Sequence, residues 1–438
     1  MREDVVIIGG GLAGSEAAWQ AATRGARVTL YEMRPKEPTP AHKTGFLAEL
    51  VCSNSLGSAD AASAPGILKE EMRRLNSLII RIADDVRVPA GSALAVDRDL
   101  FSQRITRTLE EHPNIRILHE EIKDIPTGNV CIIATGPLTS DRLAASIRTL
   151  TQEQSLYFYD AISPIIDADS IDMERVFRAS RYDKGSADYL NCPMDQATYD
   201  VFYDALLNAE KVQPKEFEKA QYFESCIPIE VMAERGRQTM LFGPLKPVGL
   251  EDPVTRVRPH AVVQLRAENR HGSCYNMVGF QTKLTYPEQK RIFRMIPGLE
   301  KAEILRYGSL HRNTFINSPR LLTQTLQVKS QPTTFFAGQL VGVEGYTESA
   351  AMGGLAGINA MRTLTGLPLV TPPPTTAHGS LLHYITTCDP AHFQPINTNY
   401  GIFPPLPQRV RDKEEKRRAI GRRAVKDLEE WTMRSGLS

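Results

Sequence analysis

The sequence predicts an α/β fold whose main sheet is assembled from two separate segments of the chain. Three observations predict it. An apolar strand with a glycine-rich loop opens the chain, a second strand ends in an acid, and the same strand–turn–helix pattern resumes near residue 333. Between these segments, aromatic residues cluster and short strands replace the β–α alternation. We therefore expect an inserted α+β domain there, and a helical tail at the C-terminus.

Residues 4–34 (DVVIIGGGLAGSEAAWQAATRGARVTLYEMR) contain each part of a dinucleotide-binding unit in order. After an apolar strand, Gly9, Gly11 and Gly14 fall in GxGxxG register and open a helix that should run to about residue 24. The first glycine permits a tight turn, the second lets the backbone approach a pyrophosphate, and the third lets helix and strand pack closely. Glu32 ends the next strand, where a carboxylate can bind ribose hydroxyls. This is the pattern of a Rossmann-type domain.

The unit predicts FAD or NAD, and Glu32 favours a ribose without a 2′-phosphate. A later segment favours FAD. There a strand over 333–337 is followed by a turn at Gly338 and a helix over 346–364 that carries three glycines. Such glycines are costly in a helix, so we expect another backbone or a flat ligand close by. A dehydrogenase that binds only NAD would not need this return of the chain.

An earlier strand that ends in Ala-Thr-Gly is also typical of flavin-dependent proteins. The residues expected to bind the cofactor are therefore Gly9, Gly10, Gly11, Leu12, Ala13, Gly14, Glu32, Ala134, Thr135, Gly136, Gly338 and Tyr346.

The chain has 438 residues, 42% of them apolar, with 52 Lys and Arg against 51 Asp and Glu, so its net charge is +1. This balance excludes a globally basic nucleic-acid-binding protein and leaves only local patches. No apolar run approaches the ~18 residues of a spanning helix, and the first strand begins too early for a signal peptide. We expect a soluble, cytoplasmic protein.

Four segments are expected. Residues 1–154 form the first segment of the FAD-binding domain, and 155–305 the inserted α+β domain. Residues 306–370 form the second segment of the FAD-binding domain, and 371–438 a Pro-rich linker with a basic C-terminal helix. Within the first segment, 46–58 (FLAELVCSNSLGS) should begin as a helix and end in a turn.

The six cysteines are scattered without a CxxC pair, which argues against a zinc site, a dithiol redox pair and a disulfide scaffold. We propose no metal ligands. Most of these thiols should be structural. Cys52 stands out because a polar turn that ends in glycine follows it, and its backbone N–H groups could stabilise a thiolate.

Motifs along nearly the whole chain carry a family resemblance, among them VCSNSLG (51–57), LNCPM (190–194) and LHRNT (310–314). The chain closely resembles the bacterial folate- and FAD-dependent tRNA (uracil-5-)-methyltransferases, relatives of the larger GidA-type tRNA-modifying flavoproteins. The resemblance implies methylation of uridine C5 in the tRNA T loop. Methylenetetrahydrofolate would donate the carbon, FAD would carry the methylene group and electrons, and NAD(P)H would be the reductant.

The resemblance also implies roles for three residues. Cys226, in YFESCIP, matches the thiol that adds to uracil C6 and so activates C5. Cys52 matches a second functional cysteine, expected to act as the base that removes the C5 proton. His311 matches the histidine that stacks the pterin of the folate against the flavin. Cys192 is expected to be structural.

Three other functions stay open. The same chemistry could act on a ribosomal RNA uridine. Wobble-uridine modification, as in the GidA group, is less favoured because we see no long C-terminal extension. A flavin-bound RNA-binding module without catalysis is the non-enzyme alternative. For RNA contact, the candidate basic clusters are Arg175, Arg178, Arg181 and Lys184, then Lys290, Arg291 and Arg294, and the C-terminal arginines; each could instead be ordinary solvated surface.

Overall fold

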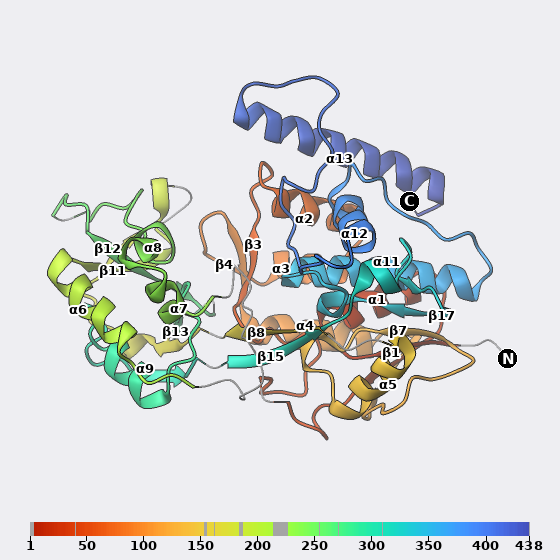
Figure 1. The fold of residues 1–438 in the computed structure, drawn as a ribbon, viewed down its shortest axis with the longest axis horizontal. Coiled ribbons are helices and arrows are strands. Elements are labelled where there is room, and N and C mark those ends of the chain that lie inside the picture. Colours follow the sequence, from red (N-terminus) through yellow and green to blue (C-terminus); the bar gives the residue numbers. More distant parts are fainter. Residues whose placement is uncertain are drawn as a thin grey trace.

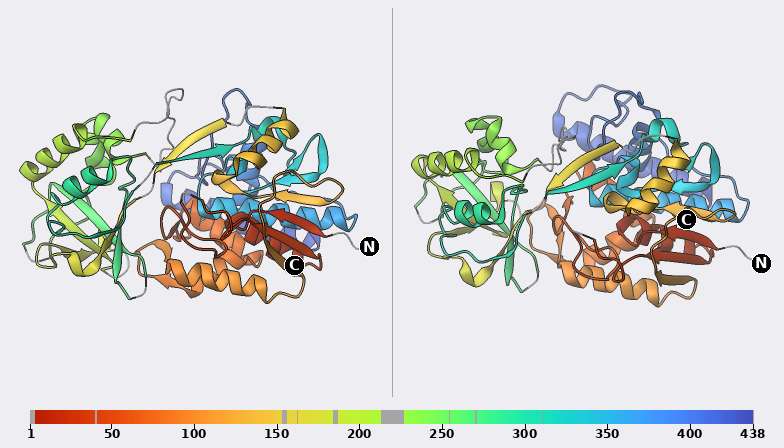
Figure 2. Two further views of the ribbon diagram at one scale, coloured as in Figure 1. Left: turned by 90° about the horizontal axis from the view of Figure 1, so that it is seen from below. Right: turned by 60° about the horizontal axis from the view of Figure 1, so that its bottom comes forward.

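The computed structural model describes residues 4–39, 41–152, 156–161, 163–183, 187–212, 227–253, 255–269, 271–308 and 310–437. Its ribbon forms two lobes (Figures 1 and 2). We call the described residues of 4–152 and 316–437 the first lobe, and those of 163–308 the second lobe. Two antiparallel strands, β8 (Leu156–Ala161) and β15 (Leu310–Phe315), run between them.

The first lobe is built on a six-stranded sheet in the order β16-β17-β7-β1-β2-β6. Its strands are β1 (Val5–Ile8), β2 (Val28–Glu32), β6 (Ile115–His119), β7 (Val130–Ile133), β16 (Gln327–Val328) and β17 (Gln331–Phe336). All neighbours pair in parallel except β16 and β17. The predicted α/β fold with a parallel sheet is confirmed, and β17 joins this sheet from late in the chain.

The helices of the first lobe are α1 (Leu12–Ala22), α2 (Ala64–Arg74), α3 (Leu78–Asp85), α4 (Arg98–Glu110), α5 (Asp141–Thr151), α10 (Ser318–Leu321), α11 (Tyr346–Leu364), α12 (Ala377–Thr387) and α13 (Lys413–Ser435), with 3-10 turns η1 (Gly136–Leu138) and η5 (Gly338–Val341). A small antiparallel sheet contains β3 (Ser55–Ser58), β4 (Arg87–Val88) and β5 (Ala93–Val96).

Helices α1 and α11 pack backbone against backbone. A Cβ atom on Gly353 would lie 2.2 Å from the Ala13 carbonyl oxygen, and one on Gly357 would lie 2.4 Å from that of Ala17. These contacts account for two of the three glycines within α11. The expected close approach of another backbone is therefore confirmed, and it fixes the N-terminus of α11 relative to the glycine loop.

The helix expected at the start of residues 46–58 is wrong: no helix forms there, and β3 begins at Ser55. Tertiary hydrogen bonds occupy the backbone instead. The Ala48 N–H donates to the Gly10 carbonyl at 2.9 Å, and the Leu47 N–H donates to Thr106 Oγ1 at 2.8 Å. Ala48 also has φ +52°, which a right-handed helix excludes.

The tail contains one helix that the sequence did not indicate. Helix α12 follows the proline run, and the buried carboxylate of Glu71 accepts from the Ala377 N–H at 2.6 Å and from the His378 N–H at 3.0 Å. These bonds satisfy N–H groups at the start of α12. Beyond it, α13 buries one apolar stripe, the one expected from the sequence: Ile420, Ala424, Leu428 and Trp431.

The second lobe has its own apolar core and an antiparallel sheet in the order β10-β11-β12-β13-β9-β14. Its strands are β9 (Ile165–Asp167), β10 (Phe177–Ala179), β11 (Tyr189–Met194), β12 (Ala261–Ala267), β13 (Cys274–Met277) and β14 (Ile304–Arg306). Its helices are α6 (Gln196–Leu207), α7 (Ile229–Glu234), α8 (Arg237–Phe242) and α9 (Tyr286–Phe293), with 3-10 turns η2 (Ala168–Ser170) and η3 (Arg181–Asp183). Among the helices described in either lobe, none has the length and apolar character that crossing a membrane requires.

Candidate active site

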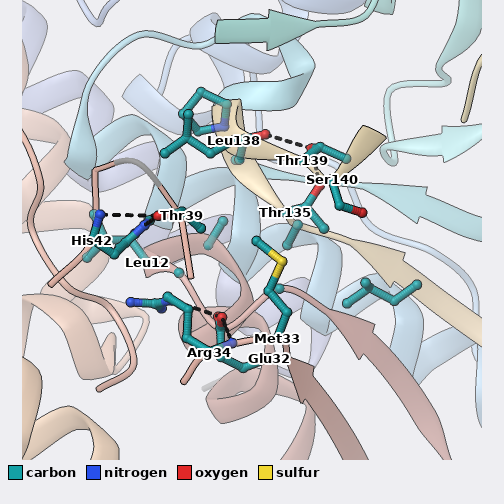
Figure 3. A pocket seen from close by; sticks show the side chains of 18 of the residues that line it. Leu12, Glu32, Met33, Arg34, Thr39, His42, Thr135, Leu138, Thr139 and Ser140 are labelled. Carbon is teal, nitrogen blue, oxygen red and sulfur yellow. Dashed lines mark hydrogen bonds and ion pairs between the residues drawn. The ribbon is translucent and has the colours of Figure 1, made fainter. Parts of the chain in front are cut away.

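A cavity in the first lobe brings together most of the residues expected to bind a cofactor (Figure 3). It encloses about 1010 Å³, counting the part open to solvent. It lies at the carboxyl ends of β1, β2 and β7, where open α/β sheets bind ligands. The predicted residues that line it are Gly9, Gly11, Leu12, Ala13, Glu32, Ala134, Thr135, Gly136, Gly338 and Tyr346.

The three motif glycines have different surroundings. Gly9 has φ +102°, and a Cβ atom there would lie 2.7 Å from the Ala134 carbonyl oxygen. A Cβ atom on Gly14 would lie only 1.8 Å from the Gly9 carbonyl oxygen, so this glycine lets α1 pack on the loop. Gly11 is the opposite case, because nothing lies within 4 Å of its hypothetical Cβ. Space is thus kept open above Gly11, at the N-terminus of α1, where backbone N–H groups attract anions.

Glu32 is held as a buried anion beside this loop. Its Oε2 accepts the Gly10 N–H at 2.9 Å, and its Oε1 accepts the backbone N–H and the Nε–H of Arg34, each at 2.9 Å. Burial raises the pKa of Glu32, but the hydrogen bonds and charge of Arg34 and the Gly10 N–H outweigh it and lower the pKa overall. Gly10, which was expected to bind the cofactor, is not among the residues that line the cavity. Its N–H instead orients the Glu32 carboxylate, which does line it. A carboxylate oxygen has two lone pairs, so Oε2 can still accept a hydroxyl donor.

His42 also lines the cavity, although no sequence motif indicates a role for it. Its backbone N–H donates to Thr39 Oγ1 at 3.1 Å, and its Nδ1 lies 2.6 Å from the same oxygen (Figure 3). Burial, and next the charge of Arg34, lower the pKa of His42 to about 4. The ring is therefore neutral at pH 7. The residue lies in an irregular proline-rich loop, where no periodicity could have indicated it.

The Cys52 loop, residues 50–57, borders this cavity through Tyr346. The Tyr346 hydroxyl oxygen accepts the Cys52 N–H at 2.7 Å and the Ser53 N–H at 3.3 Å, and the same residue lines the cavity. Burial raises the pKa of Tyr346, so the hydroxyl stays protonated. One side chain thus connects the start of α11, the cavity and the loop that carries Cys52.

The second lobe fixes the same loop from its other side. Arg266 on β12 donates from Nε to Asn54 Oδ1 at 2.9 Å and from Nη2 to Ser53 Oγ at 2.7 Å. Asn54 in turn donates from Nδ2 to the Ala267 carbonyl at 2.9 Å. Arg266 and Asn54 are both buried. Ser53 and Asn54 therefore have their positions set by a strand more than 200 residues away in the sequence.

Arg98 provides a further attachment between the lobes. Its Nη1 donates to the Leu50 carbonyl at 2.7 Å, and its Nε donates to Glu268 Oε2 at 2.9 Å. Arg98 and Arg306 both lie within electrostatic range of Cys52. These guanidinium groups give the junction a positive field, which suits an anionic group of a substrate.

Two of the predicted site residues cannot be placed in this arrangement. Cys226 lies outside the described residues. The backbone of His311 lies in β15, opposite Asp160 of β8, and its side chain is not among those described. Among the five cysteines of the described chain, none forms a disulfide. Cys131 and Cys192 are fully buried, and burial raises the pKa of Cys131 to about 12 and that of Cys192 further, which makes both thiols inert.

Comparisons with known proteins agree with this architecture. A family model described as "Glucose inhibited division protein A" matches residues 4–368. Two relatives, from Pelotomaculum thermopropionicum and Heliobacterium modesticaldum, are both named "Methylenetetrahydrofolate--tRNA-(uracil-5-)-methyltransferase TrmFO". They are 58% and 60% identical to this chain over 427 residues, which cover 98% of this chain and 98% and 97% of the relatives.

The fold also resembles solved structures. GidA from Aquifex aeolicus, in its form II crystal, aligns with a TM-score of 0.73 over 100% of this chain and 74% of that chain. The form I crystal of the same protein gives a TM-score of 0.72. At 18% sequence identity, this likeness concerns the fold.

Proposed function

The chain belongs to the methylenetetrahydrofolate–tRNA-(uracil-5-)-methyltransferase TrmFO family, and on this premise we propose that it methylates C5 of a uridine in the T loop of tRNA. The carbon comes from methylenetetrahydrofolate, and NAD(P)H provides the reducing equivalents. In the net reaction the uridine loses its C5 hydrogen as a proton and gains a methyl group. Methylenetetrahydrofolate, NAD(P)H and one proton from solvent become tetrahydrofolate and NAD(P)⁺, and the C5 proton and the solvent proton end on the two folate nitrogens that held the methylene group.

We propose FAD as the cofactor and the first lobe as a two-segment Rossmann-type FAD-binding domain, with the second lobe inserted between its segments. The residues fit this group. Open space above Gly11 at the start of α1 suits the pyrophosphate, and the ionised Glu32 suits the ribose hydroxyls. Tyr346 and Gly338 line the same cavity. When bound, FAD supplies two-electron chemistry and a carrier for the one-carbon unit. The domain boundaries at 154, 305 and 370 stay predictions.

The protein's own side chains activate the base. Uracil C5 is a weak nucleophile, and addition of a thiolate to C6 turns the ring into an enolate that can attack through C5. We assign this addition to Cys226 and removal of the C5 proton to Cys52. His311 is assigned to stacking on the pterin. The target base must leave the folded loop to reach these groups, as bases do in other nucleobase-modifying enzymes.

One observation supports this proposal most strongly. Tyr346 lines the dinucleotide cavity, and its hydroxyl holds the backbone of Cys52 at 2.7 Å. A cofactor in the cavity and a reactive thiol on the loop would therefore share one centre.

The test is transfer of an isotope-labelled methylene group. The purified protein is incubated with labelled methylenetetrahydrofolate, NAD(P)H and either tRNA or ribosomal RNA, and digested nucleosides are analysed for labelled 5-methyluridine. We expect label in tRNA, and none when the target T-loop uridine is replaced by cytidine. If label appeared only in ribosomal RNA, the proposed reaction would be correct but tRNA would not be the substrate. RNA binding without label in any RNA would favour a non-catalytic flavin-bound module.

A further inference from the structure

The second lobe carries a concave polar surface, here called the arginine cup, that the proposed chemistry leaves unused. Its polar lining includes Arg178, Tyr182, Glu251, Arg256 and Arg258, and it encloses about 1180 Å³, counting space open to solvent. The side chains come from β10, from the turn at η3 and from the segment after α8. It is separate from the dinucleotide cavity, whose lining lies in the first lobe.

The cup has an excess of positive charge. Arg178, Arg256 and Arg258 are all exposed. Arg178 Nη2 donates to the Tyr275 hydroxyl at 3.2 Å, and Arg256 lies 3.7 Å from the carboxylate of Glu251. Arg258 has no ion pair within the described ranges. Three guanidinium groups thus face one carboxylate in the lining, and this imbalance suits a phosphate.

In the other basic clusters named from the sequence, several arginines already have partners. Arg175 pairs with Glu300, Arg291 pairs with Glu288 at 2.6 Å, and on α13 Arg422 pairs with Glu415 at 2.5 Å. Arg294 donates to the Ala302 carbonyl at 2.9 Å. Arg418 and Arg422 also line a hollow, beside α2, but each pairs with a glutamate of α13. Arg178, by contrast, lines the cup and donates to a hydroxyl rather than to an acid or a backbone carbonyl.

Tyr182 provides a rigid flat surface beside these arginines. Its backbone N–H donates to the Gly249 carbonyl at 2.9 Å, and a Cβ atom on Gly249 would lie 2.9 Å from its ring. The ring therefore lies on the Gly249 backbone, while 58% of the residue stays exposed. Arg181 holds the supporting turn, because its Nη1 donates to the carbonyls of Lys246 at 2.5 Å and Val248 at 3.0 Å. An exposed aromatic ring fixed in this way is suited to stack a nucleobase.

The cup lies close to the Cys52 loop along the sheet. Ala179, which lines the cup, is in register with Tyr189, and Tyr189 is in register with Arg266. Arg266 in turn donates to Ser53. Adjacent strands are ~4.8 Å apart, so two spacings separate the cup from the strand that holds the loop, about 10 Å. This distance is within reach of nucleotides that flank a flipped base.

We infer that the arginine cup binds an unstacked nucleotide of the RNA substrate near the target uridine, with its phosphate on Arg178 and Arg258 and its base on Tyr182. The inference rests on the proposed function, because it takes RNA as the substrate. Stacking on an aromatic ring and phosphate contacts from arginines are the usual means of recognising single-stranded RNA.

The test measures binding of a fluorescent T-loop stem-loop RNA to the FAD-loaded protein by anisotropy, at several salt concentrations. The variants are Arg178→Gln with Arg258→Gln, and Tyr182→Ala. Removing both arginines from this one phosphate should weaken binding about tenfold or more at low salt and reduce the salt slope by roughly 0.7. Tyr182→Ala should weaken binding about fivefold or more, and Tyr182→Phe should restore it, because the ring alone stacks. Flavin content checks the first lobe, and circular dichroism with a thermal melt checks that the second lobe is folded in each variant.

Arg291→Gln is the matched control, because it removes one exposed arginine of the same lobe that is already paired. It should change RNA affinity less than about twofold. If the cup variants bind RNA as tightly as wild type, or if Arg291→Gln weakens binding as much as they do, the cup is not an RNA site. A loss confined to the KM for methylenetetrahydrofolate would also overturn it. If wild type binds the RNA and the cup variants do not, but no RNA is methylated, the cup stands and the proposed function fails.

Discussion

The dinucleotide cavity and the Cys52 loop lie side by side but are assembled in different ways. The cavity is shaped by backbone: Gly9 and Gly14 leave no room for side chains, and Gly11 keeps space open. The loop is shaped by side chains from distant parts of the chain, Arg98, Arg266 and Tyr346. Substitutions should therefore affect the two regions differently. Steric change in the cavity should cost cofactor, whereas loss of a hydrogen bond at the loop should cost catalysis with the cofactor still bound.

The largest expected effect concerns Cys226, the cysteine proposed to add to uracil C6. If Cys226 adds to C6, RNA with 5-fluorouridine at the target position should form an adduct that survives denaturation, because fluorine cannot leave as a proton does. Cys226→Ala should abolish this adduct and leave flavin content unchanged. Denaturing gels of labelled RNA measure the fraction of RNA held in the adduct.

Cys52→Ala is the companion variant. It should lower turnover yet still form the adduct, because Cys52 acts later on the C5 proton. An adduct that persists in Cys226→Ala and disappears in Cys52→Ala would mean that the two roles are exchanged.

The next largest effect separates two glycines of one motif. Gly14→Ala places a Cβ atom 1.8 Å from a backbone oxygen, so both folding and FAD binding should be lost. Gly11→Ala meets no protein atom within 4 Å, so the flavin-free protein should melt at the wild-type temperature. It should nevertheless bind FAD much more weakly, because the methyl group occupies the space kept for the pyrophosphate. Thermal melts and FAD titration test both variants. If Gly11→Ala bound FAD with wild-type affinity, the pyrophosphate would not lie above Gly11.

At the Cys52 loop, Arg266→Gln should lower kcat with FAD retained. The variant removes two charge-assisted hydrogen bonds, each worth about 1.5–3 kcal/mol, to Ser53 and Asn54. We expect a loss in kcat of roughly 10- to 100-fold. Flavin absorbance of the purified variant and turnover with T-loop RNA give the two readouts. If FAD affinity fell as much as kcat, the loop and the cavity would not be separable.

His311→Ala should have a smaller effect. Aromatic stacking is worth about 0.5–1.5 kcal/mol, so affinity for the folate should fall by around tenfold at most, with FAD retained. The KM for methylenetetrahydrofolate measures it. An unchanged KM and kcat would place His311 outside the folate site.

The smallest effect is on stability in acid. The pKa of His42 is about 4 in the folded protein and 6.5 ordinarily, so between these values the unfolded chain binds a proton that the folded one does not. Stability from the neutral ring is complete above pH 6.5 and is lost as the pH falls towards 4. His42→Asn should therefore lose less Tm than wild type between about pH 7.5 and pH 5. An equal loss of Tm in the variant and in wild type would show that protonation of His42 does not contribute.

The same contrast explains how much the sequence could predict. Gly9, Glu32 and the start of α11 at Tyr346 follow from local patterns, because strand, turn and helix chemistry is encoded within a few residues. The attachment of the Cys52 loop by Arg266 is not encoded locally, since donor and acceptor are 213 positions apart. Helix α12 has a local N-cap, Thr376, but the Glu71 carboxylate of α2 that also binds its first N–H groups is 306 positions away from Ala377. Residues 46–50 have helix-forming composition, but their backbone is used in tertiary hydrogen bonds.

The most direct test of the account is a single turnover without excess reductant. The bound flavin is reduced anaerobically with one equivalent of NAD(P)H, and methylenetetrahydrofolate and T-loop RNA are then added together or separately. If the cavity and the Cys52 loop form one centre, the flavin absorbance should return only when both substrates are present, with one 5-methyluridine formed per flavin. Equal yield of 5-methyluridine from flavin-free protein, or from oxidised protein without reductant, would contradict the account.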